Sequence, residues 1–126
     1  MASPNDTRRI LVVDDRPEMA EMIADDLSDR GYEGLAVTSG REALRMLRTE
    51  RIDVLVTDLR MPEIDGLALL HASLDLDPSR PVIMMTAYGT IDTAMEATGS
   101  GAYHYLTKPF RLEALVRVLE QALHAR

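Results

Sequence analysis

Short, mainly apolar runs recur along the chain and are separated by longer polar stretches. The runs cover residues 10–13, 35–37, 52–58, 80–87 and 102–109. They are rich in β-branched residues and show no helical spacing, which is typical of strands buried on both faces of a sheet. The run at 35–37 gives the weakest signal. The pattern therefore predicts five short strands.

Between the runs, apolar residues recur with the spacing of a helix face. Helices are predicted from Pro17 to Gly31, from the Ser39–Glu42 capping box through Leu47, from Gly66 to about Leu74, over 91–98 and over 112–123. Alternating strands and helices imply a parallel sheet with helices on both faces and right-handed crossovers. We expect one α/β domain at residues 8–126, preceded by a disordered tail at residues 1–7.

Composition limits the possible classes of protein. At 126 residues, with 46% hydrophobic and 28% charged residues, the chain has the size and make-up of one globular domain. No apolar run approaches the roughly 18–20 residues that cross a bilayer, and no signal-peptide pattern is present, so we expect a cytoplasmic protein without a membrane partner. Cysteine is absent, which excludes disulfides and thiolate metal sites. A net charge of −7 argues against direct nucleic-acid binding and fits a local cation site.

Polar residues that can carry chemistry stand where the predicted strands end. Asp14 and Asp15 follow the first strand, Asp58 closes the third, and Thr86 and Lys108 stand near the ends of the fourth and fifth. Open parallel sheets bind ligands outside the carboxyl ends of their strands, so these side chains are expected to converge. An aspartate after a strand is also commonly a helix cap or part of an Asx turn, and that alternative stays open for Asp15.

Three converging carboxylates repel one another unless a cation compensates them. Oxygen ligands without nearby histidine or cysteine favour Mg²⁺, with Mn²⁺ as the second choice. A carboxylate beside such a cation can attack phosphorus and form an acyl phosphate. Asp58 is the predicted nucleophile because it stands alone at its strand end, and Asp14 and Asp15 are predicted to hold the metal. Thr86 and Lys108 would then contact the phosphoryl oxygens.

Four stretches together resemble the response-regulator receiver domain of two-component signalling. They are the Asp14–Asp15 pair, "DLRMPEIDG" from Asp58, "MMTAYG" around Thr86 and "YLTKPF" around Lys108. The segment from Met85 onward most resembles receivers of nitrogen-regulator-class transcription activators. The resemblance implies a doubly wound, flavodoxin-like sheet with the strand order 2-1-3-4-5. Within the second stretch, Gly66 is expected to permit a backbone conformation that would strain other residues.

The resemblance also implies roles for the acidic residues. Asp58 would be the phosphoacceptor, and Asp15 and Asp58 would ligate Mg²⁺ through their side chains. Asp14 would act mainly through water, and the backbone carbonyl of Arg60 would be a further ligand. No other cofactor is expected.

Further residues match positions that respond to phosphorylation in the family. Thr86 would move toward the phosphoryl group, and Tyr105 would turn inward with it as a switch residue. The Lys108–Pro109 peptide bond is expected to be cis, which would aim the lysine. Arg60 and Tyr88 would flank the path of an attacking water and so affect the lifetime of the phosphoryl group.

The partners implied by the resemblance are a sensor histidine kinase and an output domain or partner protein, in transcription regulation. A homodimer through the face of the fourth helix, fifth strand and fifth helix is also implied. The domain is expected to be regulatory rather than an enzyme, although it would promote its own phosphorylation and dephosphorylation. The sequence leaves open whether it is one domain of a longer regulator or a stand-alone receiver.

Three alternatives are less well supported. A Mg²⁺-dependent phosphatase with an aspartyl nucleophile usually has a second acid two residues later, where this chain has Arg60 after Asp58. A flavodoxin-like binding module would need a phosphate loop, whereas the first strand leads into the acidic "DDRPE". A degenerate receiver that only docks partners would not need all five site residues.

Overall fold

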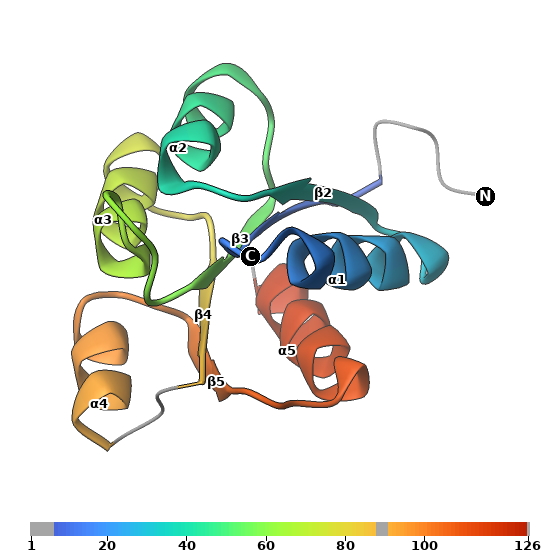
Figure 1. Ribbon diagram of the computed structural model, residues 1–126. Coiled ribbons are helices and arrows are strands. Elements are labelled where there is room, and N and C mark those ends of the chain that lie inside the picture. Colours follow the sequence, from blue (N-terminus) through green and yellow to red (C-terminus); the bar gives the residue numbers. More distant parts are fainter. Residues whose placement is uncertain (1–6, 88–90, 126) are drawn as a thin grey trace.

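A parallel sheet of five strands runs through the middle of the molecule, with helices on both faces (Figure 1). The computed structural model describes residues 7–87 and 91–125. The strands are β1 (Arg9–Val13), β2 (Glu33–Val37), β3 (Val54–Asp58), β4 (Val82–Thr86) and β5 (His104–Thr107). They lie in the order β2-β1-β3-β4-β5, which confirms the predicted topology.

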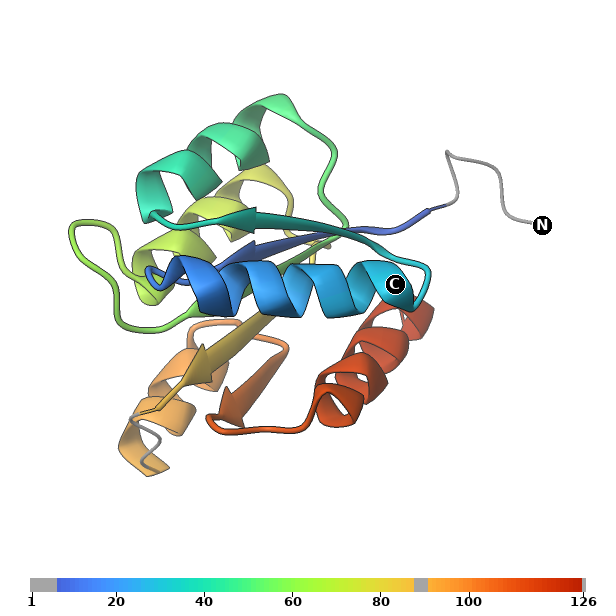
Figure 2. The same cartoon turned by 45° about the vertical axis from the view of Figure 1, so that its right-hand side comes forward.

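The helices follow the strands in strict alternation. They are α1 (Pro17–Asp29), α2 (Gly40–Thr49), α3 (Gly66–Leu76), α4 (Ile91–Gly99) and α5 (Leu112–Ala125). In Figure 1, α1 and α5 lie on one side of the sheet, and α2, α3 and α4 lie on the other. Figure 2 shows α1 running alongside β1 and β2. No helix in the described ranges is long and apolar enough to cross a bilayer.

Three strands are shorter than their apolar runs predict. Before β3, the carboxylate of Asp53 accepts a hydrogen bond from the N–H of Arg9 at 2.8 Å. Before β4, Pro81 has no N–H to donate, and only its carbonyl joins the neighbouring strand, by accepting from the N–H of Leu55 at 3.1 Å. The run at 102–109 shortens to His104–Thr107, so Lys108 lies just beyond the end of β5.

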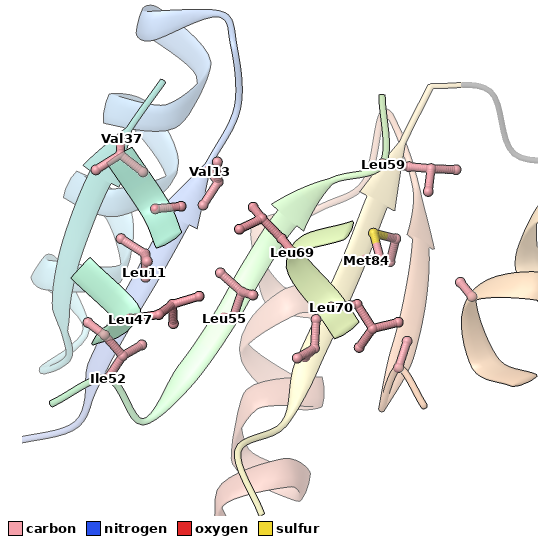
Figure 3. Close-up of a cluster of buried hydrophobic side chains, with 14 residues drawn as sticks. Leu11, Val13, Val37, Leu47, Ile52, Leu55, Leu59, Leu69, Leu70 and Met84 are labelled. Carbon is pink, nitrogen blue, oxygen red and sulfur yellow. The ribbon is translucent and has the colours of Figure 1, made fainter. Parts of the chain in front are cut away.

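Alternate residues of the inner strands point to opposite faces of the sheet. The face under α1 and α5 receives Ile10, Val12, Val54, Val56, Ile83 and Met85. The face under α2, α3 and α4 receives Leu11, Val13, Leu55, Val82 and Met84. Figure 3 shows this second cluster, in which Leu69 and Leu70 of α3 pack with strand residues. Each fully buried aliphatic side chain stabilises the fold by about 1.5–3 kcal/mol, so burial of the inner strands holds in place the strand ends that carry the site.

Ser39 caps α2, as its capping box predicts. Its Oγ accepts a hydrogen bond from the N–H of Glu42 at 3.1 Å. Ser39→Ala is therefore expected to lower the free energy of unfolding by about 1 kcal/mol, because the first turn loses one bonded donor. Urea unfolding measures this effect. Ser39→Asn, which keeps an acceptor, is the matched control, and an alanine variant as stable as the wild type would contradict the prediction.

Candidate functional site

The predicted site residues meet at the carboxyl edge of the sheet. Asp14 directly follows β1, Asp58 ends β3, Thr86 ends β4 and Lys108 directly follows β5. The strands are parallel and in register, so their ends lie side by side. Strand pairing therefore brings Lys108 next to Asp14 and Asp58, which lie 94 and 50 residues away from it in the sequence.

Lys108 is the central cation of the site. Its Nζ lies 2.5 Å from Oδ2 of Asp14 and 3.2 Å from Oδ2 of Asp58. The side chain is only 8% exposed, and the backbone N–H donates to the carbonyl of Thr86 at 2.8 Å. The Lys108–Pro109 bond is cis, as predicted. Lys108 is thus held both by its backbone and by two carboxylates.

Asp14 is completely buried. Its Oδ1 accepts a hydrogen bond from the N–H of Arg16 at 2.9 Å, which forms an Asx turn. Burial alone would raise the pKa of the Asp14 carboxyl, but hydrogen bonds from Lys108 and from the Arg16 backbone outweigh it and hold this pKa below its ordinary value. The Asx turn that was an alternative role for Asp15 is therefore formed by Asp14. The N-cap residue of α1 is Arg16, and its side chain makes no capping hydrogen bond.

The pKa of the Asp58 carboxyl is shifted in the opposite direction to that of Asp14. Burial raises the pKa of its carboxyl, and the charge of Asp14 raises it further, against the attraction of Lys108. Its Oδ2 meets Lys108, and its Oδ1 accepts a long hydrogen bond of 3.4 Å from the N–H of Arg60. Ionised Asp58 therefore carries negative charge that its surroundings only partly neutralise.

Asp15 completes an all-oxygen donor set. It is exposed, and within the described ranges its side chain makes no hydrogen bond or ion pair. Each of Asp14, Asp15 and Asp58 offers a carboxylate oxygen, and these oxygens lie within 4.8 Å of one another. Hard oxygen donors with net negative charge fit Mg²⁺ or Mn²⁺.

A cleft of about 580 Å³ opens over this cluster. It is lined by Asp15, Arg16, Asp58, Arg60, Ala87 and Lys108. Asp14 lies beneath the lining, where it contacts Lys108 and Arg16. The cleft thus exposes two of the three carboxylates and three cations to a ligand.

The predicted switch residues lie on the neighbouring strands. Thr86 is completely buried at the end of β4. Tyr105 pairs in register with Met84 and packs, partly buried, against the core cluster under α2, α3 and α4. The alternation along β4 puts Thr86 on the same face as Met84, so Thr86 and Tyr105 share a face. Tyr88 lies outside the described residues.

Two features of the site differ from the sequence interpretation or were missed by it. Gly66 is not in the left-handed region; the residue of that loop with positive φ is Glu63, at 64°. The glycine is needed instead because a Cβ there would lie 2.4 Å from the carbonyl oxygen of Asp58. Arg16 was missed as a site residue. Its position directly after two aspartates was the one available signal.

Comparison with known proteins agrees with this geometry. The family described as response regulator receiver domain matches residues 10–120. The transcriptional regulatory protein GlrR of Escherichia coli (strain K12) is 39% identical over 114 residues, which are 90% of this chain and 26% of that protein. The chain therefore spans about a quarter of the length of this relative.

Solved structures of response regulators have the same fold as this chain. The receiver domain of NtrX from Brucella abortus is 34% identical, with a TM-score of 0.87, over 93% of this chain and 99% of that one. A Burkholderia pseudomallei response regulator, with a phosphorylated aspartic acid, calcium ion and citrate, is 30% identical, with a TM-score of 0.84, over 94% of this chain and 69% of that one. These matches confirm the expected resemblance to receivers of nitrogen-regulator-class transcription activators. With the fold, the strand order and the matched family in agreement, the chain belongs to the response regulator receiver domains of two-component signalling.

Proposed function

We propose that Asp58 accepts a phosphoryl group from a sensor histidine kinase or a small phosphodonor, and that this event controls an output domain or partner protein. The observation that carries the proposal is the position of Lys108 Nζ between two carboxylates at the mouth of a cleft. An ammonium group held there can neutralise oxygens of a phosphoryl group on Asp58.

Asp58 is the best nucleophile of the three carboxylates. Asp14 is buried, and both of its oxygens already bind cationic or N–H donors. Asp15 is exposed and has no residue to orient it in the described ranges. Asp58 lines the cleft, and its raised pKa gives the ionised form more basic oxygens.

The transfer is a substitution at phosphorus. An oxygen of Asp58 forms the new P–O bond of an acyl phosphate, while the bond between phosphorus and the donor breaks and the donor leaves with that electron pair. Lys108 and the Thr86 hydroxyl would hold the transferred oxygens, and neither residue needs to gain or lose a proton. The work of the site is therefore positioning and charge neutralisation.

The acidic cluster fits Mg²⁺, with Mn²⁺ as a substitute. Asp15 and Asp58 would bind it directly, Asp14 mainly through water, and the Arg60 carbonyl would be a further ligand. The burial of Asp14 beneath Lys108 supports its indirect role. When bound, the cation supplies further neutralisation of phosphoryl charge. The phosphorylated aspartic acid and calcium ion of the Burkholderia pseudomallei relative support this combination of groups.

The output follows from the residues next to the cleft. Thr86 would move toward the phosphoryl group and Tyr105 would turn inward behind it, changing the face built by α4, β5 and α5. That face would contact an output domain, a partner protein or a second copy of the chain. Relatives about four times as long that are named transcriptional regulatory proteins support a role in transcription regulation.

Intact mass measurement tests the proposal directly. The protein is incubated with acetyl phosphate, with Mg²⁺ or with EDTA, and peptide mapping then locates the modified residue. We expect a gain of one phosphoryl group that requires Mg²⁺ and lies in the peptide containing Asp58. No gain at saturating Mg²⁺, or a phosphoryl group on another aspartate, would contradict the proposal.

A further inference from the structure

Lys108 and Arg16 both contact carboxylates of the acidic cluster, and they differ in how firmly they are held. Lys108 is 8% exposed and touches both Asp14 and Asp58. Arg16 is 50% exposed, and its Nε lies 3.5 Å from Oδ1 of Asp14. Because long, exposed ion pairs are weak and entropically costly to hold, Arg16 is the replaceable cation of the two.

The guanidinium of Arg16 lies in the field of the whole cluster. It contacts Asp14 directly, and Arg16 lines the same cleft as Asp15 and Asp58. These are the same three carboxylates whose oxygens lie within 4.8 Å of one another. Arg16 therefore supplies positive charge to the cluster that a bound divalent cation would otherwise supply.

Arg16 also has a place to go when it leaves Asp14. It lines the acidic cleft and a neighbouring groove of about 420 Å³, whose walls include Met19, Met22 and Phe110. Arginine can lay its aliphatic stem on an apolar surface while its charged end stays in water. Release from Asp14 therefore requires only a side-chain rotation and leaves the fold intact.

We propose that Arg16 is a built-in counter-ion that competes with the divalent cation for the acidic cluster and so lowers the affinity of this receiver for Mg²⁺. The inference rests on the proposed function of the site. Arg16 would offset part of the negative charge of the cluster without metal, and Mg²⁺ would bind at the expense of the Arg16–Asp14 ion pair. Removing the guanidinium is worth up to about a fivefold change in affinity, the usual range for an exposed pair.

Isothermal titration calorimetry with MgCl₂ tests the proposal on wild type, Arg16→Gln and Arg48→Gln. Glutamine removes the charge, and it is preferred to serine or asparagine because those residues would add an N-cap hydrogen bond to α1. Arg48 is an exposed arginine in the last turn of α2, so its variant makes the same change in net charge away from the cluster. Arg16→Lys keeps the charge.

We expect Mg²⁺ to bind about three to five times more tightly to Arg16→Gln, with Arg48→Gln unchanged and Arg16→Lys close to wild type. The gain should shrink in 1 M salt, where the screening length is about 3 Å. Equal or weaker binding by Arg16→Gln, or an equal gain in Arg48→Gln, would overturn the inference. The proposed function is judged separately, by phosphoryl gain of the wild type, so either can fail alone.

Discussion

Replacing Asp58 with asparagine is expected to abolish the Mg²⁺-dependent gain of a phosphoryl group, by at least about 100-fold, because the nucleophilic oxygen is lost. The same change is expected to make the metal-free protein more stable at neutral pH. Burial and the charge of Asp14 raise the pKa of the Asp58 carboxyl, so the folded protein disfavours its ionised form. Asparagine removes that charge. A variant that no longer gains a phosphoryl group but is more stable than wild type would show that Asp58 serves the phosphoryl transfer and not the stability of the fold.

The pH dependence of this stability gain has a definite sign. The pKa of Asp58 is higher in the folded protein than its ordinary value of 3.8, so wild type loses stability as pH rises from that value through the folded pKa. Asp58→Asn does not, and the difference between the two proteins should grow over the same range. Asp14 behaves in the opposite way: its pKa is lowered, so its contribution is lost as pH falls below 3.8, in both proteins.

Chemical unfolding in EDTA at several pH values measures both effects, alongside mass measurement of phosphoryl gain. Asp75→Asn is the matched control, since Asp75 is an exposed carboxylate on α3, outside the cleft. We expect this control to gain a phosphoryl group as wild type does, with a free energy of unfolding within about 0.5 kcal/mol of the wild-type value. Asp58→Asn that still gains a phosphoryl group would show that another aspartate is the acceptor. A stability difference that does not change with pH would contradict the assigned pKa direction.

Gly66→Ala is expected to destabilise the protein by about 3 kcal/mol or more. A Cβ at this position would lie 2.4 Å from the carbonyl oxygen of Asp58 and 2.8 Å from Cα of Leu59. Both are backbone atoms at the end of β3 and cannot move aside as a side chain could. The N–H of Gly66 also donates to the carbonyl of Leu59 at 2.9 Å, which ties the start of α3 to that strand. The added methyl group therefore pushes α3 away from the strand that carries Asp58.

Urea unfolding measures the cost of Gly66→Ala. Gly99→Ala provides the control, because a Cβ at this last residue of α4 would meet nothing within 4 Å. Its stability should stay within about 0.5 kcal/mol of wild type. A Gly66→Ala variant that loses less than about 1 kcal/mol would show that α3 can shift without cost, and the explanation of Gly66 by close approach would then fail.

Much of the fold and site could be predicted from sequence because both depend on local patterns. Strands buried on both faces require continuous apolar runs, and the residues that end those runs must lie at one edge of a parallel sheet. Asp14, Asp58 and Lys108 were found in this way and do converge. Strand boundaries were less accurate: the carboxylate of Asp53 bonds to Arg9, far away in the chain, and Pro81 has no N–H to pair with a neighbouring strand.

Close approach between backbones had no signal in the sequence. Gly34 illustrates this: a Cβ there would lie 2.2 Å from the carbonyl oxygen of Ala24, because α1 packs directly on β2. The distance depends on how a helix docks on a strand, and no local pattern encodes it. For the same reason, the sequence suggested backbone strain as the role of Gly66, whereas the structure shows that close approach to the end of β3 requires the glycine.

Patterns along the chain were sufficient to predict the α/β alternation, the edge of the sheet that carries the site and, apart from Arg16, the charged residues that meet there. The different roles of these residues became visible only in the folded arrangement. Asp14 became the buried partner of Lys108, Asp58 the carboxylate with the raised pKa, and Arg16 the second cation. The reason is physical: patterns along the chain specify which groups meet, whereas charge and affinity depend on burial and on distances of a few ångströms between groups.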